Sequence, residues 1–540
     1  NAGHIWESIC KTYESVVYEF RGIPMMAPDI LTVQTATSVM GNYTFKLTFE
    51  QYSVILVCMA FFFTFLRLHE VKVTEKRVFH IAGFIVVALG CGLFTNQIIL
   101  SDFMEEHQIN IRMFRPMESY QKYGGVLTFA RSVGYAVVKK PEGYTTAKVD
   151  QIIQEYEKKS ANAQQSTAKQ YPNIITVVNE TFADIKVLGN FKTNEDYMPY
   201  FHSLKKNCVT GYTYASIVGG QTANTEFELL TGNTLGFLSA GTTAFQLYIH
   251  GQMPSLVSNL KAEGYSGNKA MHPFNPYNYN RPAVYKDFGF TDFIDKFDFP
   301  KNVKRVREYI SDEANVDRII SEYEKNRKKT DQPFYMYNMT IQNHSPYDKD
   351  AANFKQPIKI ESSKYDAEAN RYLNLIKYSD DSLKQLTGYF EKCKEPTIIL
   401  FLGDHQPRLT DEFMNKITNG QYQTWSSEQM MKRYQVPFVI WANYDIKEQH
   451  IEKTSMNYIQ SILTKTAGVK MTGYQRFLNE VRKEVPTITS QGYWGKNGKF
   501  YQINDKGSPY YGIIQKYRMI QYNMMFDKKN RRDSFFEVSK

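Results

Sequence analysis

The sequence contains few cysteines. Only five of its 540 residues are cysteine, and no two of them form a C-x-x-C arrangement. This spacing indicates neither a structural zinc site nor a disulfide framework. One bridge, between Cys208 and Cys393, stays open for a domain outside the cytoplasm, although no spacing rule supports it. We therefore expect isolated thiols.

Sustained runs of one charge, internal repeats and nucleic-acid-binding motifs are also missing. The 65 Lys and Arg residues exceed the 55 Asp and Glu residues and give a net charge of +10, but the two signs are interleaved along the chain. A moderate basic excess suits anionic lipids or phosphate-bearing ligands. Without zinc-finger spacing or an RNA-recognition motif, nucleic acid is not an expected partner. We predict no protein partner either.

Long apolar runs are scarce, and the two that stand out are residues 52–66 and 78–100. The second run has the roughly 20 residues that cross the hydrocarbon core of a membrane, whereas the first is near the short limit. A pair of buried core helices is the alternative. Basic residues between the runs predict a cytoplasmic loop by the positive-inside rule. We therefore expect a multi-pass cell-membrane protein whose large domain is extracytoplasmic.

The chain divides by composition into stretches of different character. We expect, in order, an extracytoplasmic loop with amphipathic segments (1–50), two transmembrane helices with a short cytoplasmic loop (51–100), an extracytoplasmic linker (101–170), an α/β domain (171–485) and a C-terminal extension packed on that domain (486–540). Because the chain starts with Asn1 rather than Met, we also expect it to be part of a longer gene product.

After residue 171, short apolar strands alternate with helical stretches, as is typical of an α/β fold with a mostly parallel central sheet flanked by helices. Three predicted strands run directly into polar side chains. "NIITVVN" precedes Glu180, "FYMYNMTIQN" precedes His344, and "TIILFLG" precedes Asp404 and His405. Active sites of open α/β sheets lie at the carboxyl ends of the strands. These side chains are therefore expected at one edge of the sheet.

The side chains at these strand ends indicate a divalent-metal site. Carboxylate oxygens and neutral imidazole nitrogens suit Mn²⁺, Zn²⁺ or Mg²⁺. Gly403 permits a turn in which the adjacent Asp404 and His405 converge. Glu180 alone would be interpreted as a helix cap or a surface charge. Three strand ends together favour the metal site.

The segment "IVGGQTANTEFELLTG" places three threonines in a predicted helix. Thr225 with Glu228 fits a capping box, and Thr231 before Gly232 fits a helix end. Local sequence alone favours capping over catalysis for the threonines. Thr222 follows the glycine turn directly, where its hydroxyl could be presented to a metal, so both roles remain open within one helix start.

Taken together, these segments resemble the lipoteichoic acid synthase family. The resemblance rests on "NETF", "GGQTANTEFELLTG", "MHPFNPYNYNR", "NHSPY" and "GDHQP", in this order behind two predicted membrane segments. Members of that family are membrane-anchored phosphoglycerol transferases of the alkaline phosphatase and sulfatase superfamily. The resemblance covers most of the chain and implies a sulfatase-like catalytic domain over residues 171–485.

The resemblance also implies roles for individual residues. Four of them are implied to hold one Mn²⁺ or Mg²⁺: Glu180, Thr222, Asp404 and His405. Three are implied to hold the glycerophosphate headgroup: His272, Arg281 and Tyr279. Thr222 would be the nucleophile and His344 would face the reacting phosphate. The chemistry is consistent, because a metal stabilises the threonine alkoxide and a helix N-terminus favours an anion.

The implied activity is a two-step transfer at the outer membrane face. Glycerophosphate would pass from phosphatidylglycerol to Thr222, with release of diacylglycerol, and then to a hydroxyl of polyglycerophosphate or of a glycan. A sulfatase is disfavoured because "TANTE" lacks a Cys or Ser in a C/S-x-P-x-R context. A phosphoethanolamine transferase of the same superfamily and a non-catalytic, membrane-tethered polyglycerophosphate-binding protein remain the alternatives.

Overall fold

The computed structural model describes residues 77–100, 103–106, 116–135, 138–160, 170–239, 242–361, 367–420 and 422–538. The chain forms two compact units. Unit 1 comprises Asn1–Lys139 with Ser239–Thr242, and unit 2 comprises Lys140–Leu238 with Thr243–Lys540. The predicted outer loop (1–50) and the first predicted membrane span (52–66) lie outside the described residues.

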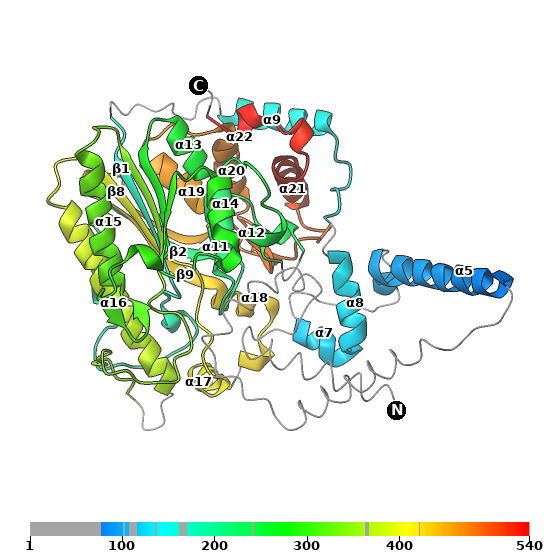
Figure 1. Cartoon of the computed structure of the whole chain (residues 1–540), viewed down its shortest axis with the longest axis horizontal. Coiled ribbons are helices and arrows are strands. Elements are labelled where there is room, and N and C mark those ends of the chain that lie inside the picture. Colours follow the sequence, from blue (N-terminus) through cyan, green and yellow to red (C-terminus); the bar gives the residue numbers. More distant parts are fainter. Residues whose placement is uncertain are drawn as a thin grey trace. The chain divides into compact units, whose positions relative to one another are not determined.

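The described part of unit 1 is helical (Figure 1). Its elements are α5 (Arg77–Phe94), the π-helix η2 (Thr95–Leu100), α6 (Phe103–Glu106), α7 (Pro116–Tyr123) and α8 (Gly125–Tyr135). The second predicted membrane span, 78–100, is divided between two elements. The α-helix α5 ends at Phe94, and the π-helix η2 continues to Leu100. In the part of the chain that the structure describes, no helix has the length and apolar character to cross a membrane. The predicted span is therefore not confirmed.

Unit 2 is built around an eight-stranded sheet with the order β10-β2-β9-β8-β1-β7-β3-β4. Its strands are β1 (Asn173–Asn179), β2 (Cys208–Tyr214), β3 (Ser266–Met271), β4 (Asp292–Ile294), β7 (Phe334–Met339), β8 (Thr397–Gly403), β9 (Gln435–Ala442) and β10 (Gln449–Ser455). Only β9 runs antiparallel to its neighbours β2 and β8, and the other strand pairs of this sheet are parallel. This topology confirms the predicted α/β fold with a mostly parallel sheet.

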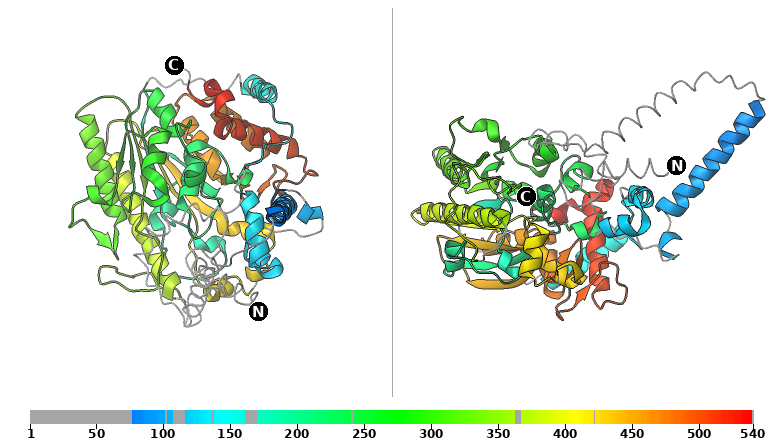
Figure 2. Two further views of the ribbon diagram at one scale, coloured as in Figure 1. Left: turned by 45° about the vertical axis from the view of Figure 1, so that its right-hand side comes forward. Right: turned by 90° about the horizontal axis from the view of Figure 1, so that it is seen from below.

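Helices cover both faces of the sheet (Figure 2), and the strands alternate their side chains between the two resulting cores. In β8, Ile398, Leu400 and Leu402 enter one core, whereas Ile399 and Phe401 enter the other. Alternation follows from the two-residue period of a strand. Both sets are apolar because both faces are buried, which is the pattern expected of central parallel strands.

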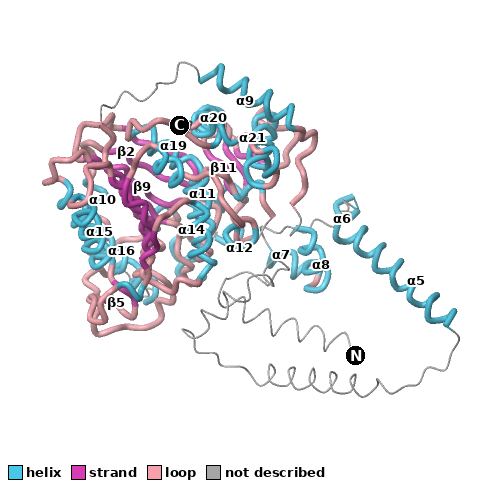
Figure 3. Tube along the Cα trace, turned by 45° about the horizontal axis from the view of Figure 1, so that its top comes forward, coloured by secondary structure: helices cyan, strands magenta, loops and turns pink. Residues whose placement is uncertain are grey.

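The first core contains side chains of α9 (Thr146–Ser160), α11 (Thr222–Thr231), α12 (Ala244–Leu247), α13 (Leu256–Ala262), α14 (Arg281–Phe288), α19 (Met456–Thr466), α20 (Gly473–Glu484), α21 (Tyr511–Met525) and α22 (Asp533–Phe536). The second contains side chains of α10 (Pro199–Ser203), α15 (Asp312–Arg327), α16 (Ala367–Phe390) and α17 (Asp411–Ile417). Figure 3 shows the strands between α15 and α16 on one side and α11 and α14 on the other.

The remaining elements are short. β5 (Arg305–Val306) pairs with β6 (Tyr309–Ile310), and β11 (Thr487–Thr489), β12 (Gly492–Trp494) and β13 (Phe500–Tyr501) form an antiparallel sheet. Single helical turns are α18 (Ser427–Met430), η3 (Ile185–Val187), η4 (Leu235–Phe237), η5 (Asn278–Asn280), η6 (Lys296–Asp298), η7 (Tyr422–Thr424), η8 (Met431–Tyr434) and η9 (Lys528–Asn530). The C-terminal residues also contribute to the first core, through Ile488, Ile514 and Phe535.

The described cysteines are not paired with one another. Cys91, Cys208 and Cys393 are all free thiols, so a bridge between Cys208 and Cys393 is contradicted. Burial raises the pKa of the Cys208 thiol to about 12, which keeps it protonated and unreactive at neutral pH. Among these residues, the expectation of isolated thiols is confirmed.

Candidate active site

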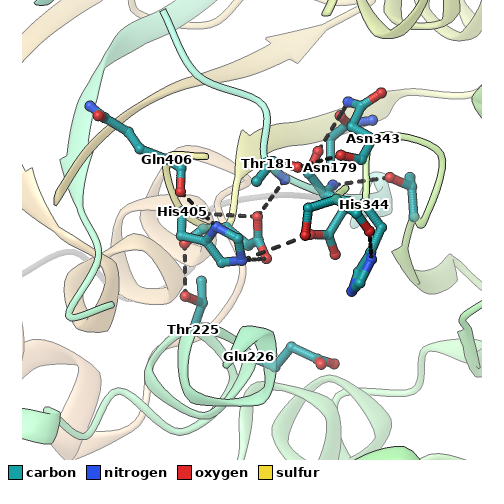
Figure 4. Close-up of polar contacts among 12 residues, drawn as sticks. Asn179, Thr181, Thr225, Glu226, Asn343, His344, His405 and Gln406 are labelled. Carbon is teal, nitrogen blue, oxygen red and sulfur yellow. Dashed lines mark hydrogen bonds and ion pairs between the residues drawn. The ribbon is translucent and has the colours of Figure 1, made fainter. Parts of the chain in front are cut away.

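Three of the four predicted metal ligands meet at the carboxyl edge of the sheet. Asn179, the last residue of β1, pairs with Gly403, the last residue of β8, so Glu180 and Asp404 leave adjacent strands at the same level. Glu180, Asp404 and His405 are buried, and each offers a ligand atom within 4.8 Å of the others (Figure 4). The parallel register of two neighbouring strands therefore assembles the cluster.

The ligand atoms of this cluster that lack hydrogen-bond partners fit a divalent cation. Nε2 of His405 lies 3.2 Å from Oδ2 of Asp404 and 3.8 Å from Oε1 of Glu180. Nδ1 of His405 donates to the Gln406 carbonyl at 3.0 Å, which leaves the Nε2 lone pair directed into the cluster. Among the described residues, neither this Nε2 nor Oδ2 of Asp404 has a hydrogen-bond partner. Buried polar atoms without partners are costly, and metal coordination would satisfy both.

The electrostatics of Glu180 support the same interpretation. Burial, with the charge of Asp404 as the second cause, raises the pKa of Glu180 well above its usual range. Two buried carboxylates repel each other unless a cation lies between them. The cluster therefore has the charge and the donor set of a metal site, with one imidazole and two carboxylates.

Asp404 is held so that one of its oxygens faces the cluster. Its Oδ1 accepts the backbone N–H groups of Thr181 at 2.7 Å and of His405 at 2.8 Å. Gly403 is needed for a different reason than predicted. Its backbone is not left-handed, but a Cβ at this position would lie 1.8 Å from the carbonyl oxygen of Phe182. Close approach of two strand ends, rather than an unusual turn, requires the glycine.

Thr222 begins α11, and a strained loop leads into it. Gly219, Gly220 and Gln221 have φ angles of 70°, 150° and 65°. A left-handed non-glycine residue such as Gln221 is unfavourable and is concentrated at functional sites. Thr225, which is three residues after Thr222 and on the same helix face, donates its hydroxyl to the Asp404 carbonyl at 2.8 Å. The first turn of α11 is therefore held against the loop that carries Asp404 and His405.

The predicted capping box of Thr225 and Glu228 is wrong. α11 starts four residues earlier than a cap at Thr225 requires, so Thr225 lies inside the helix. Oε1 of Glu228 accepts instead from the hydroxyl of Ser216 at 2.7 Å and from the backbone of Leu235 at 2.8 Å. The helix does end at Thr231, before a left-handed Gly232 with a φ of 72°, and this part of the prediction is confirmed.

His344 lies in the loop that follows β7. Its Nδ1 donates to the Ser345 carbonyl at 2.7 Å, so Nε2 of the neutral ring is an acceptor. Burial lowers the pKa of His344, and the positive charge of Arg307 acts in the same direction. Arg307 also donates to the carbonyls of Gln342 at 2.9 Å and of His344 at 2.7 Å. Arg307 was not predicted, because only the folded chain brings it to this loop.

His272 directly follows β3 at the same sheet edge. Its Nδ1 donates to the carbonyl of Met339, the last residue of β7, at 3.0 Å. Burial lowers the pKa of His272 well below its usual range, and the positive charge of Arg281 acts in the same direction. His272 is therefore a neutral imidazole with Nε2 as an acceptor.

Arg281 is not a free cation. Its Nε and Nη2 both donate to Oε1 of Glu226, at 3.1 and 2.6 Å, in a buried ion pair. The hydroxyls of Tyr285 and Tyr337 donate to the other oxygen of Glu226, at 2.5 and 3.2 Å. Tyr279, with an unusual φ of 60°, places its ring 5.1 Å from the guanidinium. Glu226 was not predicted, since its sequence position resembles any polar helix residue.

A buried polar network underlies the cluster, and it too was not predicted. Asp312 accepts from Asn179 at 2.7 Å and from Ser379 at 2.6 Å. The amide of Asn343 donates to Asn179, to Ser379 and, at 3.0 Å, to the backbone carbonyl of Glu180 (Figure 4). Asn343 precedes His344, so this network ties the loop after β7 to the end of β1.

A family model and two curated relatives match most of this part of the chain. Residues 172–469, more than half of the chain, match the family model described as Sulfatase. A Rhizobium meliloti (strain 1021) protein, provisionally named a cyclic beta-1,2-glucan modification protein, is 31% identical over 433 residues, which are 79% of this chain and 65% of that protein. The lipoteichoic acid synthase of Staphylococcus saprophyticus is 24% identical, over 73% of this chain and 61% of that protein.

A solved structure shows the same fold. The Streptococcus pyogenes phosphoglycerol transferase GacH, in complex with sn-glycerol-1-phosphate, superposes with a TM-score of 0.60 and 21% identity, covering 74% of this chain and 100% of that one. The chain spans just under two thirds, or less, of the length of the first curated relatives that it matches.

Proposed function

This chain belongs to the sulfatase family, and we propose that it is a metal-dependent phosphoglycerol transferase acting at the outer face of the cell membrane. The observation that carries the proposal is the buried cluster of Glu180, Asp404 and His405 beside the first turn of α11. A relative named for lipoteichoic acid synthesis and a structural neighbour bound to sn-glycerol-1-phosphate support glycerophosphate as the transferred group.

In the proposed first step, Oγ of Thr222 attacks the phosphorus of phosphatidylglycerol. The bond from phosphorus to the diacylglycerol oxygen breaks, glycerophosphate stays on Thr222, and the hydroxyl proton ends on diacylglycerol. Mn²⁺ or Mg²⁺, held by Glu180, Asp404 and His405 with Thr222 as the fourth ligand, would stabilise the threonine alkoxide when bound. The N-terminus of α11 adds a favourable potential for the anion.

In the proposed second step, an acceptor hydroxyl attacks the same phosphorus, the bond from phosphorus to Oγ of Thr222 breaks, and the proton of the acceptor ends on Oγ of Thr222. His344 is suited to take the proton of the acceptor, because it is neutral and its Nε2 is an acceptor. The acceptor would be a polyglycerophosphate chain or a glycan, and the relative named for cyclic beta-1,2-glucan modification supports a glycan.

We further propose that His272, Arg281 and Tyr279 hold the headgroup. Nε2 of the neutral His272 can accept a hydrogen bond from a hydroxyl of glycerol. The guanidinium of Arg281 can bind a phosphate oxygen through Nη1, since Glu226 engages its other two nitrogens. Tyr279 lies over that guanidinium and would form one wall of the pocket.

Membrane attachment through unit 1 is also a proposal. The side chains of Ile85, Val86, Val87, Leu89 and Leu93 on α5 are exposed. An apolar surface of this kind marks contact with lipid or with another protein. Binding of the chain to phosphatidylglycerol vesicles, lost when these five residues are replaced by serine, would support the membrane; unchanged binding would contradict it.

The main experiment measures diacylglycerol release from labelled phosphatidylglycerol in Mn²⁺, together with mass analysis for a glycerophosphate adduct on Thr222. Thr222→Ala should abolish both signals. Thr231→Ala makes the same chemical change at the other end of α11 and should leave both in place. Continued release by Thr222→Ala would contradict the mechanism.

Two further measurements separate the alternatives. Turnover of phosphatidylethanolamine without turnover of phosphatidylglycerol would favour a phosphoethanolamine transferase. Absence of bound metal after dialysis against Mn²⁺, with no turnover of either lipid, would favour a non-catalytic polyglycerophosphate-binding protein. Metal analysis and lipid turnover use the same purified chain, so one preparation decides between them.

A further inference from the structure

Two aromatic side chains of unit 2 stand out by their exposure. In the described residues of this unit, Tyr277 and Phe297 are the large hydrophobic side chains that face solvent, with 73% and 74% of their surface exposed. The other Phe, Tyr and Trp rings that the structure describes in this unit are buried or half-buried. Solvent-facing rings next to a reaction site need an explanation more than scattered ones do.

Both rings come from loops that leave the sheet beside the candidate active site. β3 and β4 are parallel neighbours, and Met271 pairs with Ile294 at their ends. Tyr277 lies in the loop after β3, which begins with His272. Phe297 lies in η6, directly after β4. The parallel register therefore starts both loops at the edge of the sheet that carries His272.

The two loops are joined, and aromatic contacts connect them to His344. The backbone of Lys296 donates to the carbonyl of Phe274, and the Lys296 ammonium lies 5.9 Å from the Phe274 ring and 5.1 Å from the Phe297 ring. The Phe274 ring stacks on His344, with centroids 6.2 Å apart and planes at 24°. One ring contact and two cation–ring contacts thus connect His344, through Phe274 and Lys296, to the exposed Phe297.

We propose that Tyr277 and Phe297 form a stacking platform for sugar rings of a neutral glycan acceptor. The C–H face of a pyranose packs on an aromatic face, which binds sugar without requiring charge. A polyglycerophosphate chain has no such face and carries a negative charge in each repeat, so it would be served by several cations. The two loop segments that carry the rings, residues 272–280 and 295–299, contain one Lys or Arg, which is Lys296. This inference rests on the proposed phosphoglycerol transfer and selects the glycan among its acceptors.

The test separates the donor step from transfer to each acceptor. With the full chain, Mn²⁺ and labelled phosphatidylglycerol, we compare diacylglycerol release without acceptor, transfer to a neutral β-glucan oligosaccharide, and transfer to a glycerophosphate oligomer. Tyr277→Ala with Phe297→Ala should leave release within twofold and reduce glucan transfer at least tenfold, through KM for the glucan. Phe297→Trp should retain transfer. Tyr511→Ala, a half-buried aromatic of α21, is the matched control.

Each outcome either supports or overturns the platform. Unchanged glucan transfer in the double variant would overturn it, and so would an equal loss for both acceptors, because a general structural defect affects both. Glucan binding to the Thr222→Ala chain, measured by saturation-transfer NMR, reports on the platform even when no donor is cleaved. Binding that needs Tyr277 and Phe297, combined with no lipid turnover by the unsubstituted chain, would support the platform while refuting the proposed transfer.

Discussion

Replacing Glu228 by glutamine should remove a large pH dependence from the free energy of unfolding. Glu228 lies on α11, and its side chain is fully buried. Hydrogen bonds from Ser216, Leu235 and Thr234 favour the carboxylate, but burial is the larger effect and raises the pKa of Glu228 from 4.5 to about 7. The folded chain therefore holds the proton more tightly than the unfolded chain does.

The sign and the size of the effect follow from this pKa. Below pH 4.5 the carboxyl of Glu228 is protonated in both the folded and the unfolded chain, and its contribution to the free energy of unfolding is fully present. As the pH rises from 4.5 to 7, the unfolded chain ionises first, so stability is lost. At about 1.4 kcal/mol for each pH unit, the loss amounts to about 3 kcal/mol by pH 8. A glutamine cannot ionise, so the variant lacks this loss.

The assay is urea unfolding of both chains between pH 4 and pH 8. Other groups titrate in both proteins, so the informative quantity is the difference in unfolding free energy between wild type and Glu228→Gln. This difference should change by about 3 kcal/mol, with its midpoint between pH 4.5 and 7. Glu412→Gln, at an exposed position of α17, is the control. A pH-independent difference for Glu228→Gln would refute the reasoning.

Three further predictions concern the site. Glu226→Gln should lower kcat/KM for phosphatidylglycerol at least tenfold and destabilise the fold by about 3 kcal/mol, because it leaves Arg281 buried without its counter-ion; unchanged kinetics would contradict this. Gly403→Ala should lower Tm, since its Cβ would overlap the Phe182 carbonyl; an unchanged Tm would count against that contact. Asp404→Asn should lose bound Mn²⁺ in metal analysis but keep its circular dichroism spectrum, and retained stoichiometric metal would contradict the ligand assignment.

The parts of the molecule that sequence could predict are those set by local pattern. β1, β7 and β8 are continuous apolar runs because both of their faces are buried, and a polar residue follows each run where the strand leaves the sheet. Parallel strands end at a common edge, so Glu180, Asp404 and His405 were expected to meet there, and they do. Two elementary rules were sufficient to predict that these residues meet: the residue pattern of buried strands, and the common edge at which parallel strands end.

The parts that could not be predicted depend on contacts between distant residues. Asp312 and Ser379 are 67 residues apart and meet only because α15 and α16 pack side by side on one face of the sheet. Glu226 pairs with Arg281 across 55 residues. The capping box failed for a local reason, since Gln221 adopts a left-handed conformation that its residue type disfavours. The sequence pattern did not predict this conformation, which is uncommon for a non-glycine residue and is concentrated at functional sites.

The loop that carries Asp404 and His405, two of the proposed metal ligands, also positions α11, which carries the proposed nucleophile Thr222. Gly219 donates its N–H to the Gln406 carbonyl at 2.9 Å, and Thr225 donates its hydroxyl to the Asp404 carbonyl at 2.8 Å. These bonds fix α11 on both sides of Thr222. A cation that orders Asp404 and His405 would therefore also order the start of α11, so metal binding and presentation of the Thr222 hydroxyl form one structural event rather than two independent ones.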